Sequence, residues 1–319
     1  MLSWEALQHN LEQTAHRDGL EAALLALHDQ QVEAGVVAQG LLEEIATFIP
    51  LGRDDTHHFL IQWNPTRKNR GVSPLPHPNP PHTIPFRGGM ACFCCLPVIE
   101  HQWPKERGFS QKFGDQDLIF LPNIAPIFTQ HFTVISPDHR PQDMDIALIT
   151  DVAQALPGWW VIQNGPDAGA TNPWHFHLQV FQGQLPLTRY TSTPFRTQDD
   201  WVMSQVDHPA GVVLAKASAP GISVKALVDF QNDFLAQKDS RRLNLLARAL
   251  PTGIEVYFVL RDTTFKTDFY KTGQPGYAEV GGIISVIDEE GLARWKTEGY
   301  ARYEAMMQAI NPGAMLAVQ

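Results

Sequence analysis

Residues 172–181 have the sequence NPWHFHLQVF. Apolar residues alternate with polar ones over the second half of this stretch, which predicts a half-buried β-strand. Successive side chains of a strand point to opposite faces, so His175, His177 and Gln179 are expected to share one face. Two imidazoles and an amide are thereby brought side by side. That face can meet water, a metal ion or a substrate.

The strand is preceded by a run of small residues and turn formers, NGPDAGATNP at residues 164–173. Such a run lets backbone N–H groups approach an anion closely. An exposed imidazole beside an anion site can serve as a nucleophile toward phosphorus. A His-x-His pair is weak evidence by itself, because the chain has 13 histidines among 319 residues. Histidines that merely complete a strand are the alternative.

The composition is that of an ordinary globular protein, with 44% hydrophobic and 18% charged residues. The formal net charge of −10 disfavours binding to nucleic acid, which requires clustered Lys and Arg. Small anionic ligands are compatible with it, because a few local cations suffice for them. No stretch approaches the ~18 consecutive apolar residues of a membrane span, so no membrane partner is expected.

All three cysteines lie in one short stretch, ACFCCLP at residues 91–97. An odd and clustered set is no framework for disulfides, which favours a reducing compartment. The first residues form an acidic amphipathic pattern and lack the apolar core of a secretory signal. We therefore expect a cytoplasmic protein.

The spacing of apolar residues predicts an α+β fold. Helices are predicted within residues 2–47, and the order from residue 57 on is three strands, a helix and two strands, which indicates a mostly antiparallel sheet with a packed helix. A similar order recurs further on, with a strand over 222–230 and a helix over 229–250, and suggests two related half-domains. The expected domains are an N-terminal helical segment, a catalytic half and a second, diverged half, at residues 1–56, 57–190 and 191–319.

Cys92 and Cys95 form a Cys-x-x-Cys pair, whose spacing suits two thiolates on one tetrahedral ion. A complete site needs two more ligands. The candidates are His131, His139, His175, His77 and His82. A redox-active pair is an alternative, although no thioredoxin-like pattern surrounds it. Plain buried cysteines, which pack as small hydrophobes, are another.

A local cluster of cations stands in the stretch NPTRKNRG at residues 64–71, directly after a predicted strand. Arg67, Lys68 and Arg70 can hold phosphate groups through guanidinium and ammonium contacts, or can form an exposed basic loop. Arg261, at the end of a later predicted strand, is a second candidate for binding phosphate.

These stretches together resemble the histidine-triad superfamily, and within it the transferase branch. NGPDAGATNPWHFHLQ is similar to it in the Asn-Gly, the Gly-Ala-Thr turn and the His-x-His-x-Gln, and LIFLPNIAPIFTQHFTVIS at 118–136 resembles its paired central strands. The branch contains galactose-1-phosphate uridylyltransferase and the diadenosine tetraphosphate phosphorylases, also called ATP adenylyltransferases. The resemblance covers residues 57–181 well and the C-terminal half faintly.

The resemblance implies a histidine-triad-like antiparallel sheet and nucleotidyl transfer through a covalent histidine intermediate. His177 matches the nucleophile, and His175 precedes it as an orienting residue or a metal ligand. Gln179 matches the position where hydrolase members carry a third histidine. An amide can hydrogen-bond the phosphoryl oxygens, but it cannot act as a general acid near neutral pH. A transferase is therefore favoured over a hydrolase.

The resemblance also implies the substrate. The favoured reaction is phosphorolysis of diadenosine tetraphosphate to ATP and ADP by inorganic phosphate, with magnesium accompanying the nucleotide and the protein a monomer or homodimer. Alternatives are a sugar-nucleotide phosphorylase, a hexose-1-phosphate uridylyltransferase, or a nucleotide-binding protein without turnover. The substrate-binding residues are expected to be Asn64, Arg67, Asn164, Gly169, Ala170, Thr171 and Arg261.

A structural zinc ion is implied as well. The uridylyltransferases hold zinc with a Cys-x-x-Cys pair, a His in a Ser-Pro-Asp-His stretch and the first His of His-x-His. The matching residues here are Cys92, Cys95, His139 and His175. This chain departs from the family in the Cys-to-His separation and in Trp174, which is inserted directly before His175.

Overall fold

The structure is a computed structural model that describes most of the chain: residues 3–45, 48–50, 59–65, 67, 92–170, 172–218, 222–264 and 274–310. The chain divides into two compact units. Unit 1 comprises residues 1–46, 66–143 and 171–182, and unit 2 comprises residues 47–65, 144–170 and 183–319. Each unit therefore combines segments that are far apart in the sequence.

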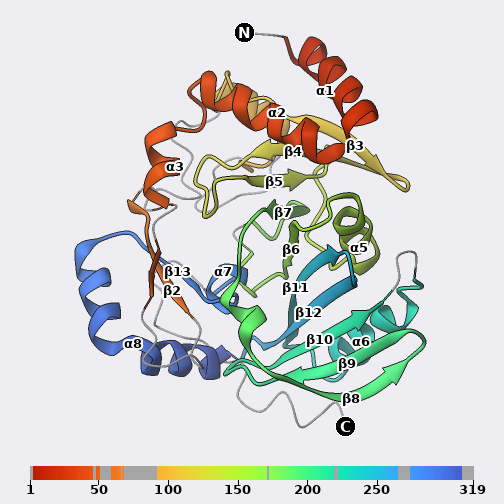
Figure 1. The fold of residues 1–319 in the computed structure, drawn as a ribbon, viewed down its shortest axis with the longest axis vertical. Coiled ribbons are helices and arrows are strands. Elements are labelled where there is room, and N and C mark those ends of the chain that lie inside the picture. The colour runs from red at the N-terminus through yellow and green to blue at the C-terminus, as the bar shows by residue number, and fades with distance from the viewer. Residues whose placement is uncertain are drawn as a thin grey trace. The chain divides into compact units, whose positions relative to one another are not determined.

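Unit 1 is an antiparallel sheet with helices (Figure 1). Its strands are, in spatial order, β3 (Phe109–Phe113), β4 (Gln116–Pro122), β5 (His131–Ile135) and β7 (His177–Phe181). Its helices are α1 (Trp4–Asp18), α2 (Leu20–Glu33), α3 (Gln39–Ile45) and α4 (Leu96–Gln102). Helix α1 contacts β3, and α2 contacts β4. Helices α1 and α2 thus pack on β3 and β4, and β4 is the strand that lies beside β5.

Local sequence explains where α1 begins and ends. The Ser3 hydroxyl accepts a hydrogen bond of 3.2 Å from the Ala6 N–H, which caps the first turn. Gly19 ends the helix with a φ of 93°, in the region that favours glycine. Leu7 and Leu11, one turn apart, are buried, so α1 has one apolar face.

Unit 2 holds a larger antiparallel sheet and a small separate one. The larger sheet has the order β6 (Trp160–Asn164), β11 (Arg241–Leu250), β12 (Gly253–Asp262), β10 (Val212–Ala217), β9 (Trp201–Val206) and β8 (Ser192–Gln198). The small sheet has the order β1 (Phe48–Pro50), β2 (Leu60–Trp63) and β13 (Ile283–Val286). The helices are α5 (Ile146–Ala155), the 3-10 helix η2 (Pro186–Arg189), α6 (Lys225–Ala236), α7 (Tyr277–Val280) and α8 (Glu289–Ile310).

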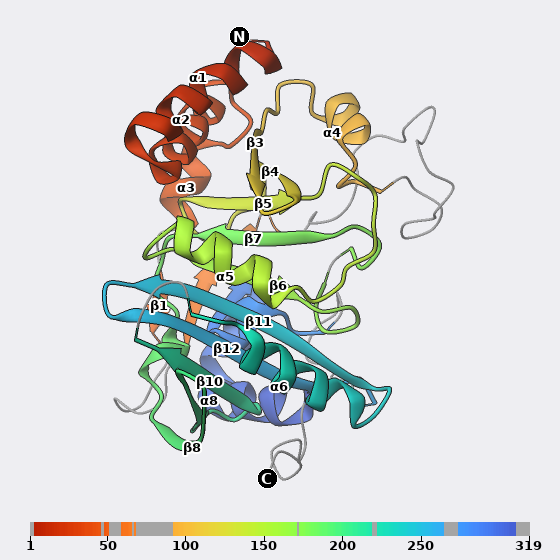
Figure 2. The ribbon, with the colours of Figure 1, turned by 90° about the vertical axis from the view of Figure 1, so that its right-hand side faces the viewer.

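Helices α5 and α6 cover one face of the larger sheet, where both contact β11 (Figure 2). Helix α5 begins at Asp145, whose carboxylate accepts a hydrogen bond of 3.0 Å from the Leu148 N–H. Beneath these helices β11 and β12 pair over their full length. The hairpin between them turns at Gly253, where a φ of 133° and the nearby carbonyl of Ala217 leave no room for a side chain.

The predicted α+β class, an antiparallel sheet with packed helices, is confirmed. Two local predictions are wrong. The strand predicted over 222–230 is largely the helix α6, and the second half of the helix predicted over 229–250 is the strand β11. Residues 243–247 of β11 are buried without interruption, so its apolar run lacks the alternation that distinguishes a strand from a helix.

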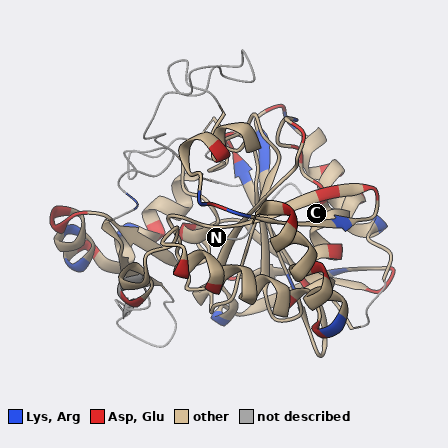
Figure 3. Cartoon of the chain, turned by 90° about the horizontal axis from the view of Figure 1, so that it is seen from above, with Lys and Arg blue, Asp and Glu red and all other residues tan. Residues whose placement is uncertain are grey.

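Charged residues of both signs are spread along the helices and strands (Figure 3), in keeping with 24 Lys and Arg and 34 Asp and Glu in the sequence. Within the part of the chain that the structure describes, none of the helices is both long enough and apolar enough to cross a membrane.

Candidate active site and metal centre

Strand β7 carries His177 and Gln179. It pairs with β5 in antiparallel register, with His177 opposite Ile135 and Gln179 opposite Thr133. His177 is buried and Gln179 is half-buried, and both belong to one face of the strand because they stand two residues apart. The predicted juxtaposition of His177 and Gln179 is therefore confirmed.

His175 lies in the turn before β7, so the prediction that it belongs to the strand is wrong. The turn is held by Asn172, whose side-chain oxygen accepts a hydrogen bond of 3.2 Å from the Trp174 N–H. The Trp174 side chain is half exposed. The turn re-aims His175 and places its imidazole in a different environment from that of His177.

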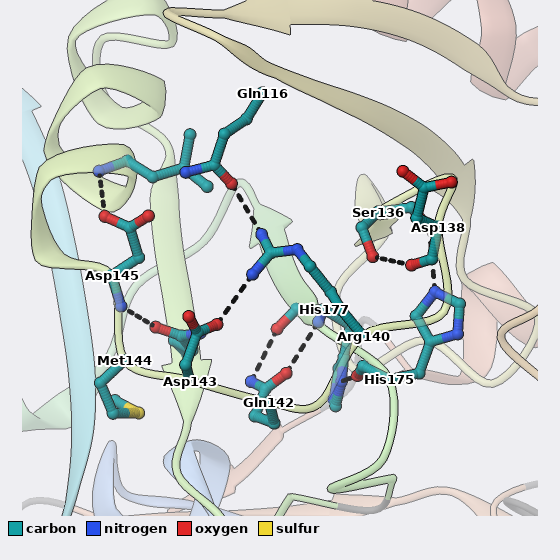
Figure 4. A network of polar contacts seen from close by, with 12 residues as sticks. Gln116, Ser136, Asp138, Arg140, Gln142, Asp143, Met144, Asp145, His175 and His177 are labelled. Atoms are coloured by element: carbon teal, nitrogen blue, oxygen red, sulfur yellow. Dashed lines mark hydrogen bonds and ion pairs between the residues drawn. The ribbon is translucent and has the colours of Figure 1, made fainter. Parts of the chain in front are cut away.

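Gln142 holds the main chain of His177 (Figure 4). Its side-chain oxygen accepts from the His177 N–H at 2.8 Å, and its side-chain NH2 donates to the His177 carbonyl at 2.9 Å. The Gln142 N–H also donates to the Pro173 carbonyl at 3.0 Å. Nearby, the Arg140 guanidinium lies 3.7 Å from the centre of the Phe176 ring. Residues 140–142 therefore fix the start of β7, much as a neighbouring strand would.

The His177 imidazole is oriented by its own chain. Its Nδ1 lies 2.9 Å from the carbonyl oxygen of His175. A carbonyl can only accept, so Nδ1 carries the proton of the neutral ring. The lone pair is then on Nε2. This tautomer is the one that a nucleophile attacking through Nε2 requires.

His175 has the opposite tautomer. Its Nε2 lies 2.9 Å from the carbonyl oxygen of Ser136 and therefore carries the proton. The Nδ1 lone pair faces two sulfur atoms, Cys92 Sγ at 3.5 Å and Cys95 Sγ at 3.6 Å. A hydrogen bond to a backbone carbonyl behind the ring is the usual arrangement for a histidine that binds a metal ion.

Cys92, Cys95, His139 and His175 form one cluster, with their ligand atoms all within 4.8 Å of one another. The His139 Nδ1 lies 3.2 Å from Cys95 Sγ. In a tetrahedral zinc site, bonds of ~2.3 Å to sulfur and ~2.0 Å to nitrogen would put S and N about 3.6 Å apart. The His175 distances of 3.5 and 3.6 Å to the two sulfurs match that value, and the His139 distance of 3.2 Å is shorter than it. The predicted four-residue set is thus brought together, and it can hold a metal ion.

The surroundings of the cysteines also suit a cation. Asn172 donates a hydrogen bond of 2.9 Å from its side chain to Cys92 Sγ. Hydrogen bonds from the thiols of Cys94 and Cys95 lower the pKa of Cys92. The same contact with Cys92 raises the pKa of Cys94 and Cys95. Ionisation of Cys92 therefore disfavours ionisation of Cys94 and Cys95, and a divalent ion bound to the cluster would offset that effect by stabilising the thiolates.

His131 was a further candidate ligand on sequence grounds, but it lies outside this cluster. Its Nε2 contacts the side-chain oxygen of Gln179 at 2.8 Å, and its Nδ1 contacts the backbone nitrogen of Ile127 at 3.0 Å. The other two candidates, His77 and His82, fall outside the described residues.

Unit 2 contains a second polar cluster, built from Asn164 at the end of β6, Asn244 in β11 and Arg261 in β12. The Asn244 side chain donates to Asn164 Oδ1 at 2.7 Å, and Arg261 Nη1 donates to Asn244 Oδ1 at 2.8 Å. Asn164 Oδ1 also accepts from the Tyr277 N–H at 3.0 Å, and Arg261 Nη1 donates to the Pro275 carbonyl at 2.7 Å. Sequence inspection missed Asn244, because its segment was predicted to be helical.

Arg261 is a buried cation, with 2% of its surface exposed. Burial lowers its pKa to about 10, against the attraction of Glu279. Among the described residues no carboxylate lies within ion-pair distance of it, and its Nη1 makes both of the hydrogen bonds described above. A guanidinium has five N–H groups in a planar fork, a geometry that suits an anionic group.

Gly169 lies where no side chain fits. Its φ is 92°, and an added Cβ would lie 2.5 Å from the Cα of Gly276. Its carbonyl accepts a weak hydrogen bond of 3.4 Å from the Asn164 side chain. Ala170, next in the chain, is half-buried, and Thr171 is outside the described residues. Within unit 2, Gly169 is therefore packed against the segment that begins α7.

The two residues predicted near 64–71 have separate locations. Asn64 is buried in unit 2 and donates to the Gln62 side chain at 3.1 Å. Arg67 belongs to unit 1, where its Nη1 donates to the Ala125 carbonyl at 2.5 Å. Lys68 and Arg70 lie outside the described residues.

Comparison with known proteins supports this arrangement at the level of the fold. A family model described as a domain of unknown function, DUF4922, matches residues 51–182. No curated protein matches the sequence. Yeast Ap4A phosphorylase Apa2 in complex with AMP is similar in structure, with a TM-score of 0.58 and 13% identity over 95% of this chain and 96% of that one. The same enzyme in complex with Ap4A gives a TM-score of 0.56 and 15% identity over 94% and 97%.

Nearly the whole of both chains is covered, so the likeness extends beyond the stretch around the histidines. The chain therefore shares the fold of yeast Ap4A phosphorylase Apa2, which agrees with the fold that the sequence resemblance predicted. The low identity means that the activity must be argued from the side chains.

Proposed function

We propose that the protein is a nucleotidyltransferase that works through a nucleotidyl–histidine intermediate on His177. The observation that carries the proposal is the tautomer of His177. Its Nδ1–H donates to the His175 carbonyl, so Nε2 bears a lone pair on the strand face that also carries Gln179. The fold shared with a phosphorylase that binds Ap4A supports the same class of reaction.

In the first step His177 Nε2 attacks the α-phosphorus of a nucleotide. The N–P bond forms as the bond from phosphorus to the bridging oxygen breaks, and the distal nucleotide leaves with that electron pair. In the second step an oxygen of inorganic phosphate attacks the same phosphorus, and the N–P bond returns its electrons to Nε2. For diadenosine tetraphosphate the products are ATP and ADP, which is the reaction we favour.

Gln179 fits transfer better than hydrolysis. Its amide can donate hydrogen bonds to phosphoryl oxygens in both steps. It has no proton to give to a leaving group and takes none from water near neutral pH. The intermediate is therefore protected until a phosphate arrives as acceptor.

For binding the phosphate groups we propose Arg261 and Asn164, with Asn244 added as the residue that orients them. A buried guanidinium without a carboxylate partner among the described residues is suited to an anionic ligand. The remaining predicted binding residues are Asn64, Arg67, Gly169, Ala170 and Thr171. Magnesium is expected to accompany the nucleotide, as it commonly does with polyphosphates.

Cys92, Cys95, His139 and His175 would hold a structural zinc ion. Two thiolates and two imidazoles are a usual zinc ligand set, and four protein ligands leave no open position for catalysis. When bound, the ion would cross-link the segment around Cys92 to the turn before β7. His175 would thereby be fixed, and its carbonyl orients His177.

Three free cysteines fit a reducing compartment, so we retain the proposal of a cytoplasmic protein, as a monomer or homodimer. The partners in this proposal are a dinucleoside polyphosphate and inorganic phosphate, without nucleic acid or membrane.

Labelled diadenosine tetraphosphate tests the proposal. Incubation without phosphate is expected to give an acid-labile, base-stable adduct on the protein, which added phosphate discharges as a nucleotide. His177→Ala should abolish the adduct, whereas His9→Ala, at an exposed histidine of α1, should retain it. A panel with UDP-glucose and GDP-glucose identifies the base and the sugar. Binding without any adduct or product would refute the enzyme and leave a nucleotide-binding protein.

A further inference from the structure

The side-chain amide of Gln179 can present either its oxygen or its NH2 group to a ligand, and the two orientations have opposite chemistry. Gln179 stands two residues after His177 on β7 and shares its face. Phosphoryl oxygens only accept hydrogen bonds, so only the NH2 group can stabilise a phosphoryl group on His177. The oxygen in its place would repel that group. The orientation of this amide therefore bears directly on the reaction.

A buried histidine of the neighbouring strand decides the orientation. His131, the first residue of β5, is 1% exposed, and its Nε2 lies 2.8 Å from the Gln179 oxygen. Its Nδ1 lies 3.0 Å from the backbone nitrogen of Ile127. A backbone N–H can only donate, so Nδ1 bears the lone pair and Nε2 bears the proton of the neutral ring. His131 consequently donates to the oxygen of Gln179.

Both alternatives to this arrangement are unfavourable. A reversed amide would set its NH2 group against the Nε2–H of His131. A proton moved to Nδ1 would face the Ile127 N–H. Each change sets two N–H donors against each other, and in the second change both donors are buried.

The ring of His131 cannot easily turn to avoid either outcome. It packs edge-on against Phe181, with ring centres 5.6 Å apart and planes at 70°. Phe181 in turn stacks on Phe128, with ring centres 4.2 Å apart. The backbone N–H of Ile127 and the aromatic packing around His131 therefore both favour the orientation in which the Gln179 oxygen faces His131.

We propose that His131 is a positioning residue that holds the Gln179 amide with its NH2 group as the donor to the phosphoryl oxygens of the reacting nucleotide. This inference rests on the proposed function. His131 acts through Gln179 and does not contact the reacting atoms. Its purely structural role would be to anchor the segment before β5 through the bond with Ile127, and that role is separable by mutation.

Two substitutions separate the hydrogen bond of His131 with Gln179 from its hydrogen bond with Ile127. The oxygen of His131→Asn lies near the position of Nδ1, so it keeps the bond with Ile127 and loses Gln179. The longer His131→Gln reaches Gln179 with its NH2 group and loses Ile127. We expect His131→Asn to lower kcat about tenfold with little change in KM, less than the ~10²–10³-fold loss on removing an oxyanion-stabilising donor outright. We expect His131→Gln to keep kcat within about threefold of the parent.

A double-mutant cycle distinguishes positioning from a general structural effect. In a Gln179→Ala background the amide is gone, so His131→Asn should have no further effect on kcat. Additive losses in the double mutant would overturn the proposal. So would a His131→Asn enzyme with unchanged kcat beside a His131→Gln enzyme that has lost activity, because that pattern assigns only the bond with Ile127.

Nitrogen NMR of the wild-type protein gives a readout that needs no activity. The account predicts that His131 is protonated at Nε2 and bare at Nδ1, and that Gln179→Ala shifts the Nε2 resonance. A proton on Nδ1 would overturn the inference even in an active enzyme. Conversely, the predicted tautomer in a protein that forms no adduct would leave the orientation of the amide established and refute the proposed function instead.

Discussion

The polar clusters of the two units are organised around charges of opposite sign. In unit 1, two sulfur atoms and two imidazole nitrogens converge within 4.8 Å, a set of ligands that prefers a soft cation. In unit 2, the Arg261 guanidinium is buried among amides and carbonyls, and within the described chain no carboxylate pairs with it. The cysteine and histidine cluster of unit 1 is thus suited to bind a cation. The Arg261 guanidinium of unit 2 is suited to bind an anion. Substitution of Cys92 in unit 1 should therefore lower metal content and stability, whereas substitution of Arg261 in unit 2 should mainly weaken nucleotide binding.

The largest effect is expected in unit 1, from Cys92→Ser. The loss of one thiolate should lower bound zinc from about one ion per chain to near zero, and it should lower the free energy of unfolding by several kcal/mol, since structural zinc has apparent binding free energies of ~10–16 kcal/mol. Elemental analysis and denaturant unfolding measure the two effects. Cys94→Ser is the matched control, because Cys94 is equally buried but outside the four-residue cluster. Equal metal content in the two variants would contradict the assignment.

In unit 2, Arg261→Met should weaken binding without the same loss of stability. Replacing charge-assisted hydrogen bonds, worth about 1.5–3 kcal/mol, should raise the Kd for nucleotide about 10–100-fold. Removal of a buried cation without a carboxylate partner should leave the unfolding temperature of the free protein unchanged or higher. Calorimetric titration and thermal unfolding check both signs. A variant that loses stability yet binds nucleotide normally would show that Arg261 serves only the fold.

Gln142→Leu tests how firmly unit 1 holds its nucleophile. The change leaves the His177 N–H and carbonyl without their side-chain partners, which should cost about 1–3 kcal/mol of stability and lower kcat. Gln142→Glu keeps the acceptor for the N–H but sets a buried carboxylate oxygen against the His177 carbonyl oxygen, so its loss of kcat should be at least as large. Steady-state kinetics and unfolding curves compare them. Equal activity of the two variants and the wild type would exclude a positioning role for Gln142.

The smallest effects concern pH, and their signs differ between the units. Burial raises the pKa of Glu106 in unit 1 to about 8, so the folded state retains a proton that the unfolded chain releases above its ordinary pKa of 4.5. This contribution to stability is lost as pH rises from 4.5 through 8. Burial lowers the pKa of His208 in unit 2 to about 3. Its contribution is present above pH 6.5 and is lost as pH falls toward 3.

Glu106→Gln should therefore flatten the alkaline side of the stability profile, and His208→Asn the acidic side. Unfolding midpoints between pH 4 and pH 9 measure both. A Glu106→Gln variant with the same alkaline slope as the parent would show that another group controls it.

The polar clusters of the two units also differ in how well the sequence predicts them. The residues of unit 1 stand in short motifs, Cys-x-x-Cys and His-x-His-x-Gln, and both resemble those of a known superfamily. The convergence of Cys92, Cys95, His139 and His175 and the joint placement of His177 and Gln179 were therefore predicted correctly. The exact start of β7 was not, because the turn at Asn172 depends on a side-chain hydrogen bond rather than on periodicity.

The cluster of unit 2 has no such motif. Asn164, Asn244 and Arg261 come from three strands, and only the pairing of β6 with β11 and of β11 with β12 brings them together. The double-sided burial of β11 hid its strand character, and Asn244 was missed with it. Gln142 was missed for a related reason: its function lies in two bonds to the backbone of a distant residue.

The central claim is that the two neighbouring histidines are held in opposite tautomers, so that His177 offers Nε2 to phosphorus while His175 offers Nδ1 to the metal cluster. The most direct test is to trap the adduct with diadenosine tetraphosphate, locate it by mass spectrometry, and compare the phosphohistidine isomer with Nε2 and Nδ1 standards. The account predicts a single adduct on Nε2 of His177. An adduct on Nδ1 or on His175, or no adduct at all with a nucleotide that binds, would contradict it.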